Sequence, residues 1–427
     1  MKTIKVDYLA RVEGEGALRI RFKGDQVRDV ELRIFEPPRF FEAFLRGRSC
    51  LEAPDITARI CGICPVAYQM SSCAAIEDAL GVRVDGGLRE LRRLIYCGEW
   101  VESHALHMFM LHAPDFLGYP DAMAMAREHR EMVMRGLRIK KAGNAIVRAV
   151  GGREVHPVNV RVGGFYSSPP RADLLALEPE LKSARDDAFE ALEWMAGFPF
   201  PDFERDYEFV ALRDPNHYPF MDGRIASSKG LDIEVRDYDD NFVEEQVAHS
   251  NALHSIVKGR GPYLCGPLSR FNLNFERLSP AAIDAARIAA ISAPCRNPFK
   301  SILVRAVETI HALDEAIRIV GRYQPPAEPF VEATMRAGVG YGCTEAPRGL
   351  LYHRYRLDDA AMIRDAKIVP PTSQNQKSME QDLLAIAPRL VVLTHDAATA
   401  MAEQTIRNHD PCISCATHFI DLTIERE

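Results

Sequence analysis

The feature that most constrains this chain is a pair of Cys-x-x-Cys motifs near its opposite ends. The first motif holds Cys61 and Cys64, and the second holds Cys412 and Cys415, so that 348 residues separate Cys64 from Cys412. The other six cysteines stand singly, and we expect them to be small buried apolar residues. If the four paired thiols act at one site, the fold must bring the two ends of the chain together. The motifs therefore favour one continuous body over separate domains.

The residues around the first motif favour thiolate chemistry. Gly62 gives the backbone between the two thiols freedom that other residues lack, and Pro65 suits the first turn of a helix. A cysteine just before that turn faces unpaired amides and the positive end of the helix dipole, which stabilise a thiolate. We therefore expect the helix start to favour the thiolate of Cys64.

Spacing alone leaves more than one kind of site open. Zinc ribbons bring their cysteine pairs within a few tens of residues, and a lone redox Cys-x-x-Cys usually belongs to a βαβ unit, so neither arrangement matches this chain. Four thiolates at one site suit nickel, iron, copper or zinc, and not magnesium or calcium. A transition-metal centre and a structural zinc site stand as equal alternatives at this stage.

The charge balance argues against two classes of partner. The chain has 53 Lys and Arg against 60 Asp and Glu, a net charge of −7. Such a surface does not favour nucleic acid or an anionic membrane. No apolar run approaches the roughly 18 residues of a spanning helix, and the first residues lack the pattern of a signal peptide. We expect a cytoplasmic protein.

Hydrophobic periodicity predicts a mainly helical α+β protein with small sheets. Residues 1–36 are predicted to form a small amino-terminal sheet, with strands near 4–8, 17–22 and 27–35. Helical periodicity extends over residues 66–80, 88–111, 129–150, 298–320 and 394–408. Asn297 is the expected cap of the fourth of these helices, and Ser279 the cap of another short one.

The rest of the chain carries weaker patterns. Strands near 350–356 and 362–369 predict a second hairpin, and the glycine-rich run 338–342 predicts a turn that allows close approach. Residues 199–240 are expected to be an irregular insertion with one short strand near 231–236. Because no linker or repeat divides the sequence, residues 1–427 are predicted to be a single domain.

With their flanks, the two motifs resemble the signatures of the large subunit of nickel–iron hydrogenases. They are Arg59-Ile60-Cys61-Gly62-Ile63-Cys64-Pro65 and Asp410-Pro411-Cys412-Ile413-Ser414-Cys415-Ala416-Thr417-His418. Further segments match in order: Arg11–Gly14, Phe41–Arg48, Glu102–His104, His156-Pro157 with Gly163-Gly164, and Glu345–Gly349. The resemblance extends over the whole chain and is greatest to the shorter cytosolic branch of bidirectional and sulfhydrogenase-like enzymes. It implies that family's helical body with an amino-terminal sheet.

The resemblance implies a nickel–iron centre held by the four motif cysteines. Cys61 and Cys412 are the expected terminal ligands of nickel, and Cys64 and Cys415 are expected to bridge to an iron that also carries two cyanides and one carbonyl. The implied reaction is the heterolytic cleavage of dihydrogen to protons and electrons. Four thiolates form a soft, electron-rich donor set that suits such chemistry.

The resemblance also implies roles for residues around this centre. Glu13 is the expected first relay of the proton from Cys412. Arg348, which follows Pro347, is expected to place its guanidinium beside the cyanides, and Asp410 to orient that guanidinium or a water. Taken without the resemblance, these are a loop glutamate, a surface arginine and an aspartate that ends a helix.

Two further sets of residues match the family pattern. Thr372 and Ser373 resemble the segment that donates hydrogen bonds to one cyanide, although such sequences are also common turn material. Glu42 and His418 resemble ligands of a separate structural magnesium or iron ion. Their ordinary alternatives are a solvated glutamate on a helix and a histidine at a strand edge.

The family implies several partners. Besides dihydrogen, these are an iron–sulfur small subunit that takes the electrons and diaphorase subunits that pass them to NAD(P) or another soluble carrier. Nickel-insertion factors and a maturation endopeptidase are implied as well. Residues 419–427 are the expected extension that the endopeptidase removes, unless this relative keeps its tail.

Two departures from the pattern and three other classes of protein bear on this hypothesis. Tyr68 stands where many relatives have histidine, and Ser103 stands where the uptake branch has aspartate. The main alternative is a regulatory subunit that senses dihydrogen with little turnover. A structural zinc protein could use the same four cysteines, whereas the quinone subunit of respiratory complexes shares the fold but lacks the four thiolates.

Overall fold

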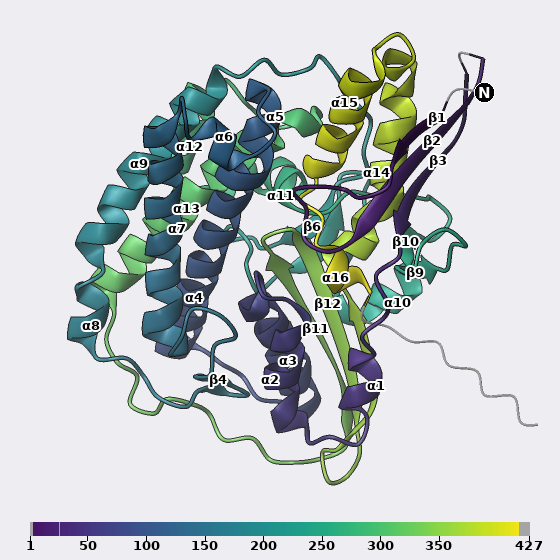
Figure 1. The fold of residues 1–427 in the computed structure, drawn as a ribbon. Coiled ribbons are helices and arrows are strands. Elements are labelled where there is room, and N and C mark those ends of the chain that lie inside the picture. Colours follow the sequence, from purple (N-terminus) through teal and green to yellow (C-terminus); the bar gives the residue numbers. More distant parts are fainter. Residues whose placement is uncertain (1–2, 25, 418–427) are drawn as a thin grey trace, which may run out of the picture.

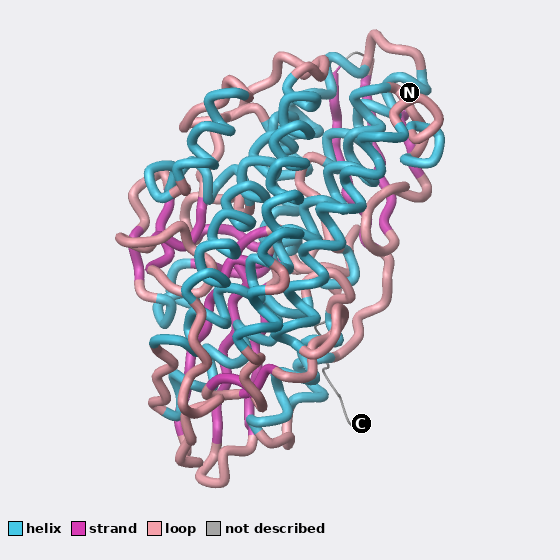
Figure 2. Tube along the Cα trace, turned by 90° about the vertical axis from the view of Figure 1, so that its left-hand side faces the viewer, coloured by secondary structure: helices cyan, strands magenta, loops and turns pink. Residues whose placement is uncertain are grey.

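The computed structural model describes residues 3–24 and 26–417, which form a helical body packed against small antiparallel sheets (Figure 1). Four long helices of the body lie side by side: α4 Gly86–Ala105, α7 Arg130–Gly151, α9 Glu178–Ala196 and α13 Ser301–Arg322. Figure 2 shows this helical layer facing the viewer. The prediction of a mainly helical fold with small sheets is confirmed.

The helix predicted over residues 88–111 changes its geometry before its end. It is α-helical to Ala105, continues as a π-helical turn over Leu106–His112, and then becomes α5, Ala113–Leu117. Pro114 has no amide hydrogen to donate, which disfavours a regular α-helix at this point. The π turn packs on the carboxyl-terminal part of the chain, because His112 Nε2 lies 3.0 Å from Asn408 Oδ1.

A three-stranded sheet packs directly against α3, Pro65–Leu80. Its antiparallel strands are β11 Gly338–Ala346, β12 Gly349–Leu357 and β13 Ile363–Val369. The prediction of a turn over 338–342 is wrong, since these residues begin β11. Close approach is nevertheless the reason for glycine here, because a Cβ on Gly340 would lie 1.9 Å from the main-chain oxygen of Ala75 in α3.

The predicted amino-terminal sheet is confirmed. Its strands are β1 Thr3–Val6, β2 Gly16–Lys23 and β3 Gln26–Ile34, paired in that order. Alternate residues of β2 are buried, as expected for a strand with one face on the core. The sheet lies beside α14, Pro371–Leu390, and α15, His395–Arg407 (Figure 1).

The segment 199–240 is more regular than the sequence suggests. Instead of one short strand it contains an antiparallel sheet of β6 Val210–Arg213, β7 Arg224–Ser227 and β8 Asp232–Ile233. The first three residues of β6 are all buried, so the strand shows no polar–apolar alternation. The predicted strand at 231–236 is only two residues long, because a 3₁₀ turn follows at Val235–Asp237.

Short elements complete the body. The helices are α1 Phe41–Leu45, α2 Ala53–Thr57, α6 Ala122–Met125, α8 Arg171–Leu175, α10 Tyr238–Asn241, α11 Pro267–Asn274, α12 Pro280–Ile288 and α16 Ile413–Ala416. The strands are β4 Val160–Arg161, β5 Gly164–Phe165, β9 Phe242–Glu245 and β10 His254–Val257. Ser279 caps α12, and Asn297 caps the 3₁₀ turn that leads into α13, as predicted. Within the described residues, every helix is too short or too polar to cross a bilayer.

Segments from near the two ends of the chain meet inside the molecule. Glu13 and Cys412 form an isolated parallel bridge, in which the amide of Ile413 donates to the main-chain oxygen of Glu13 at 2.8 Å. On the other side, the amide of Arg39 donates to the main-chain oxygen of Thr417 at 2.8 Å. The fold therefore brings the second cysteine motif to the region that holds the first.

Candidate metal centre

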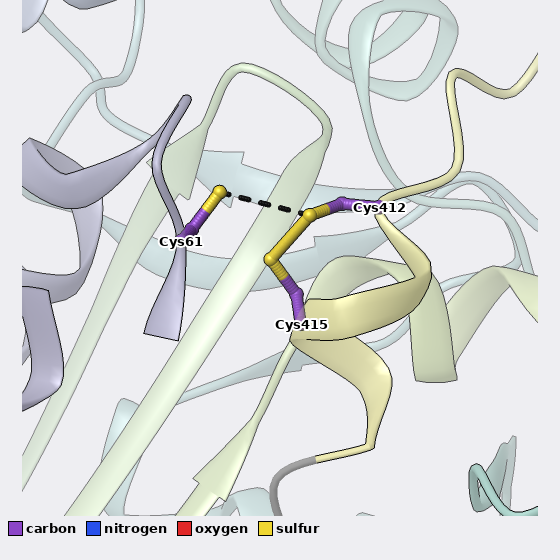
Figure 3. A group of neighbouring side chains, drawn as sticks. All are labelled: Cys61, Cys412 and Cys415. Atoms are coloured by element: carbon purple, nitrogen blue, oxygen red, sulfur yellow. Dashed lines mark hydrogen bonds between the residues drawn. A yellow bond between two sulfur atoms is a disulfide. The ribbon is translucent and has the colours of Figure 1, made fainter. Parts of the chain in front are cut away.

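Three sulfur atoms converge where the ends of the chain meet (Figure 3). The ligand atoms of Cys61, Cys412 and Cys415 all lie within 4.8 Å of one another, and the Sγ atoms of Cys61 and Cys412 are 3.6 Å apart. Cys61 comes from the loop before α3, whereas Cys415 belongs to α16. The sulfurs of Cys412 and Cys415 are joined as a disulfide. Metal binding requires the reduced thiolates of this pair.

Cys64 adjoins this group through Cys61. The amide of Cys64 donates to Cys61 Sγ at 3.2 Å, and the amide of Ile63 donates to the same sulfur at 3.3 Å. Burial raises the pKa of the Cys61 thiol, but hydrogen bonding with Cys64 and the positive charge of Arg348 outweigh it, so the pKa is lowered. The hydrogen bond with Cys61, together with burial, raises the pKa of Cys64 well above its usual value. Cys61 is therefore the more acidic member of the first motif.

The prediction that the start of α3 favours a Cys64 thiolate is wrong. The first free amides of the helix are occupied by a carboxylate from α4, since Glu99 accepts from Val66 at 2.6 Å and from Ala67 at 3.0 Å. The Cys64 side chain makes no capping hydrogen bond. Burial raises the pKa of Glu99 well above its ordinary value. Sequence analysis missed Glu99 because it lies more than 30 residues from the amides that it caps.

Glu13 lies directly beside the second motif. Cys412 Sγ is 3.1 Å from Glu13 Oε2, and the amide of Ser414 donates to the same oxygen at 3.1 Å. The hydroxyl of Ser414 in turn donates to Glu36 Oε2 at 2.9 Å. A chain of polar groups thus leads from the cysteine sulfur through Glu13 and Ser414 to a second carboxylate.

A buried guanidinium faces the same centre. Arg348 lies in the turn between β11 and β12, with its Nε 2.9 Å from the main-chain oxygen of Asp410 and its Nη2 3.2 Å from Asp410 Oδ1. Both side chains are almost completely buried, with exposed fractions of 2% and 3%. Within the part of the chain that the structure describes, Arg348 Nη1 and Asp410 Oδ2 have no hydrogen-bond partner. Buried polar atoms usually have one, so this pair has donor and acceptor capacity left for a bound group.

The Arg348 turn rests on a buried ion network that sequence analysis missed. Arg270 donates to both carboxylate oxygens of Glu308, at 2.8 and 2.7 Å, and to the main-chain oxygen of Pro347 at 2.9 Å. His104 Nε2 lies 3.0 Å from Glu308 Oε2. Nothing distinguishes a buried arginine from a surface one in a single sequence. The only signals were His104 and Glu345, which belong to segments that match the family, and Glu345 Oε2 lies 3.1 Å from Arg270 Nη1.

The residues expected to contact a cyanide occupy the first turn of α14. Thr372 Oγ1 accepts a hydrogen bond from the amide of Cys412 at 2.9 Å, so this hydroxyl holds the second motif in place. Ser373 is buried next to it. Of the two departures, Tyr68 is buried with its ring 5.9 Å from that of His353, and Ser103 is buried within α4.

Glu42 lies at a second polar position. Its Oε1 accepts from the amide of Ile368 at 2.6 Å, and burial raises its pKa to about 8. Together with Glu244 and Ala416 it lines a cavity of about 240 Å³. The other expected ligand, His418, lies outside the described residues, as does the expected extension 419–427. Ala416 nevertheless brings the chain to this cavity two residues before His418.

Comparison with known proteins shows to which protein family the chain belongs. The profile of the nickel-dependent hydrogenase family matches residues 39–137 and 285–418, more than half of the chain. The alpha subunit of sulfhydrogenase 2 from Pyrococcus furiosus is 34% identical over 98% of this chain and 100% of its own length. The chain therefore belongs to the nickel-dependent hydrogenase family.

Similar proteins define the role within that family. The beta subunit of the NAD-reducing hydrogenase HoxS from Cupriavidus necator is 27% identical over 98% of this chain and 95% of its own length. The structure of an NAD+-reducing nickel–iron hydrogenase in the H2-reduced state matches with a TM-score of 0.89 and 27% identity, covering 98% of this chain and 100% of that one. The chain is the catalytic large subunit of a hydrogenase.

Proposed function

We propose that Cys61, Cys64, Cys412 and Cys415 hold a nickel–iron centre whose iron carries two cyanides and one carbonyl, and that this centre cleaves dihydrogen reversibly. The observation that carries the proposal is the convergence of three of these sulfurs, from both ends of the chain, within 4.8 Å of one another. When bound, the centre would supply the soft metal site at which dihydrogen is cleaved heterolytically, which releases two protons and two electrons in all. Four thiolates from one chain fit such a group.

The first proton acceptor outside the metals is Cys412, and Glu13 receives the proton from it. The 3.1 Å distance between Cys412 Sγ and Glu13 Oε2 is within reach for direct transfer. The Ser414 amide fixes the same oxygen and so orients the carboxylate toward the sulfur. Glu36, which accepts from the Ser414 hydroxyl, is the next carboxylate beyond Glu13, although Glu13 itself contacts Ser414 only through its amide.

The buried cation and the start of α14 position the diatomic ligands. Arg348 remains charged at any working pH, and its donors are fixed by Asp410. Its unpartnered Nη1 is the donor left for a cyanide. Pro347 lines the same turn, and Thr372 and Ser373 are placed at the helix start to contact the second cyanide. We assign Arg348 and Asp410 to the catalytic site on this basis.

A second, structural metal ion is proposed at Glu42 and His418. Magnesium is the first choice because carboxylate oxygen is its preferred ligand, and iron is the alternative because imidazole is less typical of magnesium. The cavity that Glu42 lines beside Ala416 supports this assignment. The ion ties the carboxyl end of the chain to α1.

The electrons leave through an iron–sulfur small subunit. We propose that diaphorase subunits then pass them to NAD(P) or another soluble carrier in the cytoplasm. The support is the likeness to the sulfhydrogenase and NAD-reducing subunits. Nickel-insertion factors load the centre, and a maturation endopeptidase then removes residues 419–427.

The decisive experiment compares two cysteine variants of the purified complex. Cys412→Ala is expected to lose nickel and dihydrogen oxidation, whereas Cys97→Ala, which removes a buried cysteine of α4, is expected to keep both. Elemental analysis measures nickel and zinc, and infrared spectroscopy detects the carbonyl and cyanide stretches. Stoichiometric nickel and an unchanged rate in Cys412→Ala would disprove the assignment. Zinc in place of nickel in the wild type would identify a structural site, and a loaded centre with negligible turnover would identify a sensor.

A further inference from the structure

A second group of metal-ligating side chains lies apart from the cysteines. It comprises His249, from the loop between β9 and β10, His254, the first residue of β10, and Glu380, from α14. One ligand atom from each of the three lies within 4.8 Å of the others. The loop and β10 pack against α14 beside β3, at the edge of the molecule shown on the right of Figure 1.

One oxygen of the Glu380 carboxylate is held by hydrogen bonds. Its Oε1 accepts from the amide of Leu32 in β3 at 2.9 Å and lies 2.7 Å from His249 Nε2. Its Oε2 faces His254 Nδ1 across 3.9 Å, which is too long for a hydrogen bond. Ligand atoms bound to one zinc ion at a tetrahedral angle lie roughly 3.3 Å apart, so three ligand atoms already within 4.8 Å of one another need only to draw together around the ion.

The local charges favour a cation. The side chain of His254 is almost completely buried, with an exposed fraction of 2%, and its Nε2 has no hydrogen-bond partner among the described residues. The carboxylate of Glu380 is also largely buried, with 16% of its side chain exposed, and Glu31 precedes the Leu32 amide that donates to it. A divalent ion would offset both the desolvation of Glu380 and the repulsion from Glu31.

We propose that His249, His254 and Glu380 form a binding site for a divalent transition-metal ion of the zinc type. Two imidazoles and one carboxylate are a typical three-residue ligand set for zinc, whereas magnesium and calcium prefer oxygen ligands throughout. The side chains of His249 and Glu380 are 25% and 16% exposed, so water reaches the remaining coordination position. The ion links the β9–β10 loop to α14 and, through Leu32, to β3. This site uses no residue of the nickel centre and stands independently of it.

Binding is tested on the full-length chain in its native complex with the nickel centre already loaded. After adventitious metal is removed with a mild chelator, Zn²⁺ is titrated by calorimetry into the wild type and into His249→Gln, His254→Gln and the control His395→Gln. We expect one zinc equivalent in the wild type and the control, and at least a tenfold loss of affinity in the other two variants, because ligand-shell changes cost about 10–100-fold. Saturating zinc should raise the melting temperature of the wild type and the control only.

Cobalt substitution identifies the ligands. Co²⁺ in this site should show the visible bands of nitrogen and oxygen ligation without the thiolate charge-transfer band that cysteine would give. Zinc that binds equally to all four proteins, or cobalt bound through thiolate, would overturn the proposal. If the buried His254→Gln variant does not fold, the partly exposed His249→Gln variant decides the question alone.

Discussion

The carboxylate of Glu13 and the sulfur of Cys412 are 399 residues apart in the sequence and 3.1 Å apart in the structure. Their backbones are also joined, by the bridge between the amide of Ile413 and the oxygen of Glu13. Gly14 permits this approach, because its φ is +84° and an added Cβ would lie 2.8 Å from Ile413 Cβ. The acid is therefore placed beside the thiol by the fold itself and not by a flexible side chain.

Glu13→Gln should slow proton transfer without emptying the metal site. Glutamine keeps the shape and can accept from the Ser414 amide, but it does not ionise. We expect near-normal nickel content and a fall of about 10²–10⁴-fold in H/D exchange and dihydrogen oxidation. Glu15→Gln, an exposed neighbour, is the matched control and should behave as wild type. Exchange at the wild-type rate in Glu13→Gln would remove Glu13 from the proton path.

Arg348→Lys tests whether charge alone is sufficient above the metal centre. A lysine keeps the positive charge, but its three donors share one nitrogen and do not reproduce the planar fork by which Arg348 uses Nε and Nη2 for Asp410 and directs Nη1 elsewhere. We expect turnover to fall by about 10²–10³-fold with nickel retained. Turnover and nickel content are measured together, with the exposed Arg287→Lys as control. Full activity in Arg348→Lys would show that the fixed geometry of the guanidinium is not needed.

The elements that could be predicted from sequence are those whose signal is local. Helical periodicity placed α3, α7, α13 and α15, the capping residue Asn297 marked the approach to α13, and the cysteine motifs indicated that segments near the two chain ends meet. The strands β6 and β11 were both missed because they lack a polar–apolar alternation, and the cause differs between them. The inner part of β6 is wholly buried and shows no alternation, and β11 begins with glycines that carry no side chain to alternate.

The parts of the site that escaped prediction depend on contacts between distant segments. Glu99 occupies the helix amides that the sequence offered to Cys64. Arg270 is fully buried and forms ion pairs with two carboxylates from other elements, those of Glu308 and Glu345. For Glu99 and for Arg270, tertiary packing decides both how far the side chain is buried and which group it contacts. A single sequence gives neither piece of information.

Gly340→Ala should destabilise the contact between β11 and α3. The added Cβ would lie 1.9 Å from the backbone of Ala75, so the strand and helix must separate. We expect the free energy of unfolding in urea to fall by about 1–3 kcal/mol. Gly321→Ala in α13 is the control, because a Cβ there meets nothing within 4 Å and should stabilise by about 0.5–1 kcal/mol. Equal stability of the two variants would show that the β11–α3 contact tolerates the extra carbon.

His311 should make the fold sensitive to mild acid. It is buried in α13, where its Nδ1 accepts from the amide of Ser279 at 3.0 Å, and burial lowers its pKa to about 4. The unfolded chain protonates this ring near pH 6.5 and the folded chain does not, so between pH 6.5 and 4 the unfolded state binds more protons. Stability is therefore fully present above pH 6.5 and falls with decreasing pH by up to about 1.4 kcal/mol per pH unit.

His311→Gln isolates this contribution, since glutamine can still accept from Ser279 but cannot titrate. The free energy of unfolding is measured in urea at pH 7.0 and 5.5 for the wild type, His311→Gln and the exposed control His395→Gln. The loss between the two pH values should be smaller in His311→Gln by about 1 kcal/mol and unchanged in the control. Comparing the two pH values cancels the packing lost against Tyr218, whose ring lies 4.9 Å from that of His311. An identical loss in all three proteins would mean that His311 is protonated in the folded chain as readily as in the unfolded one.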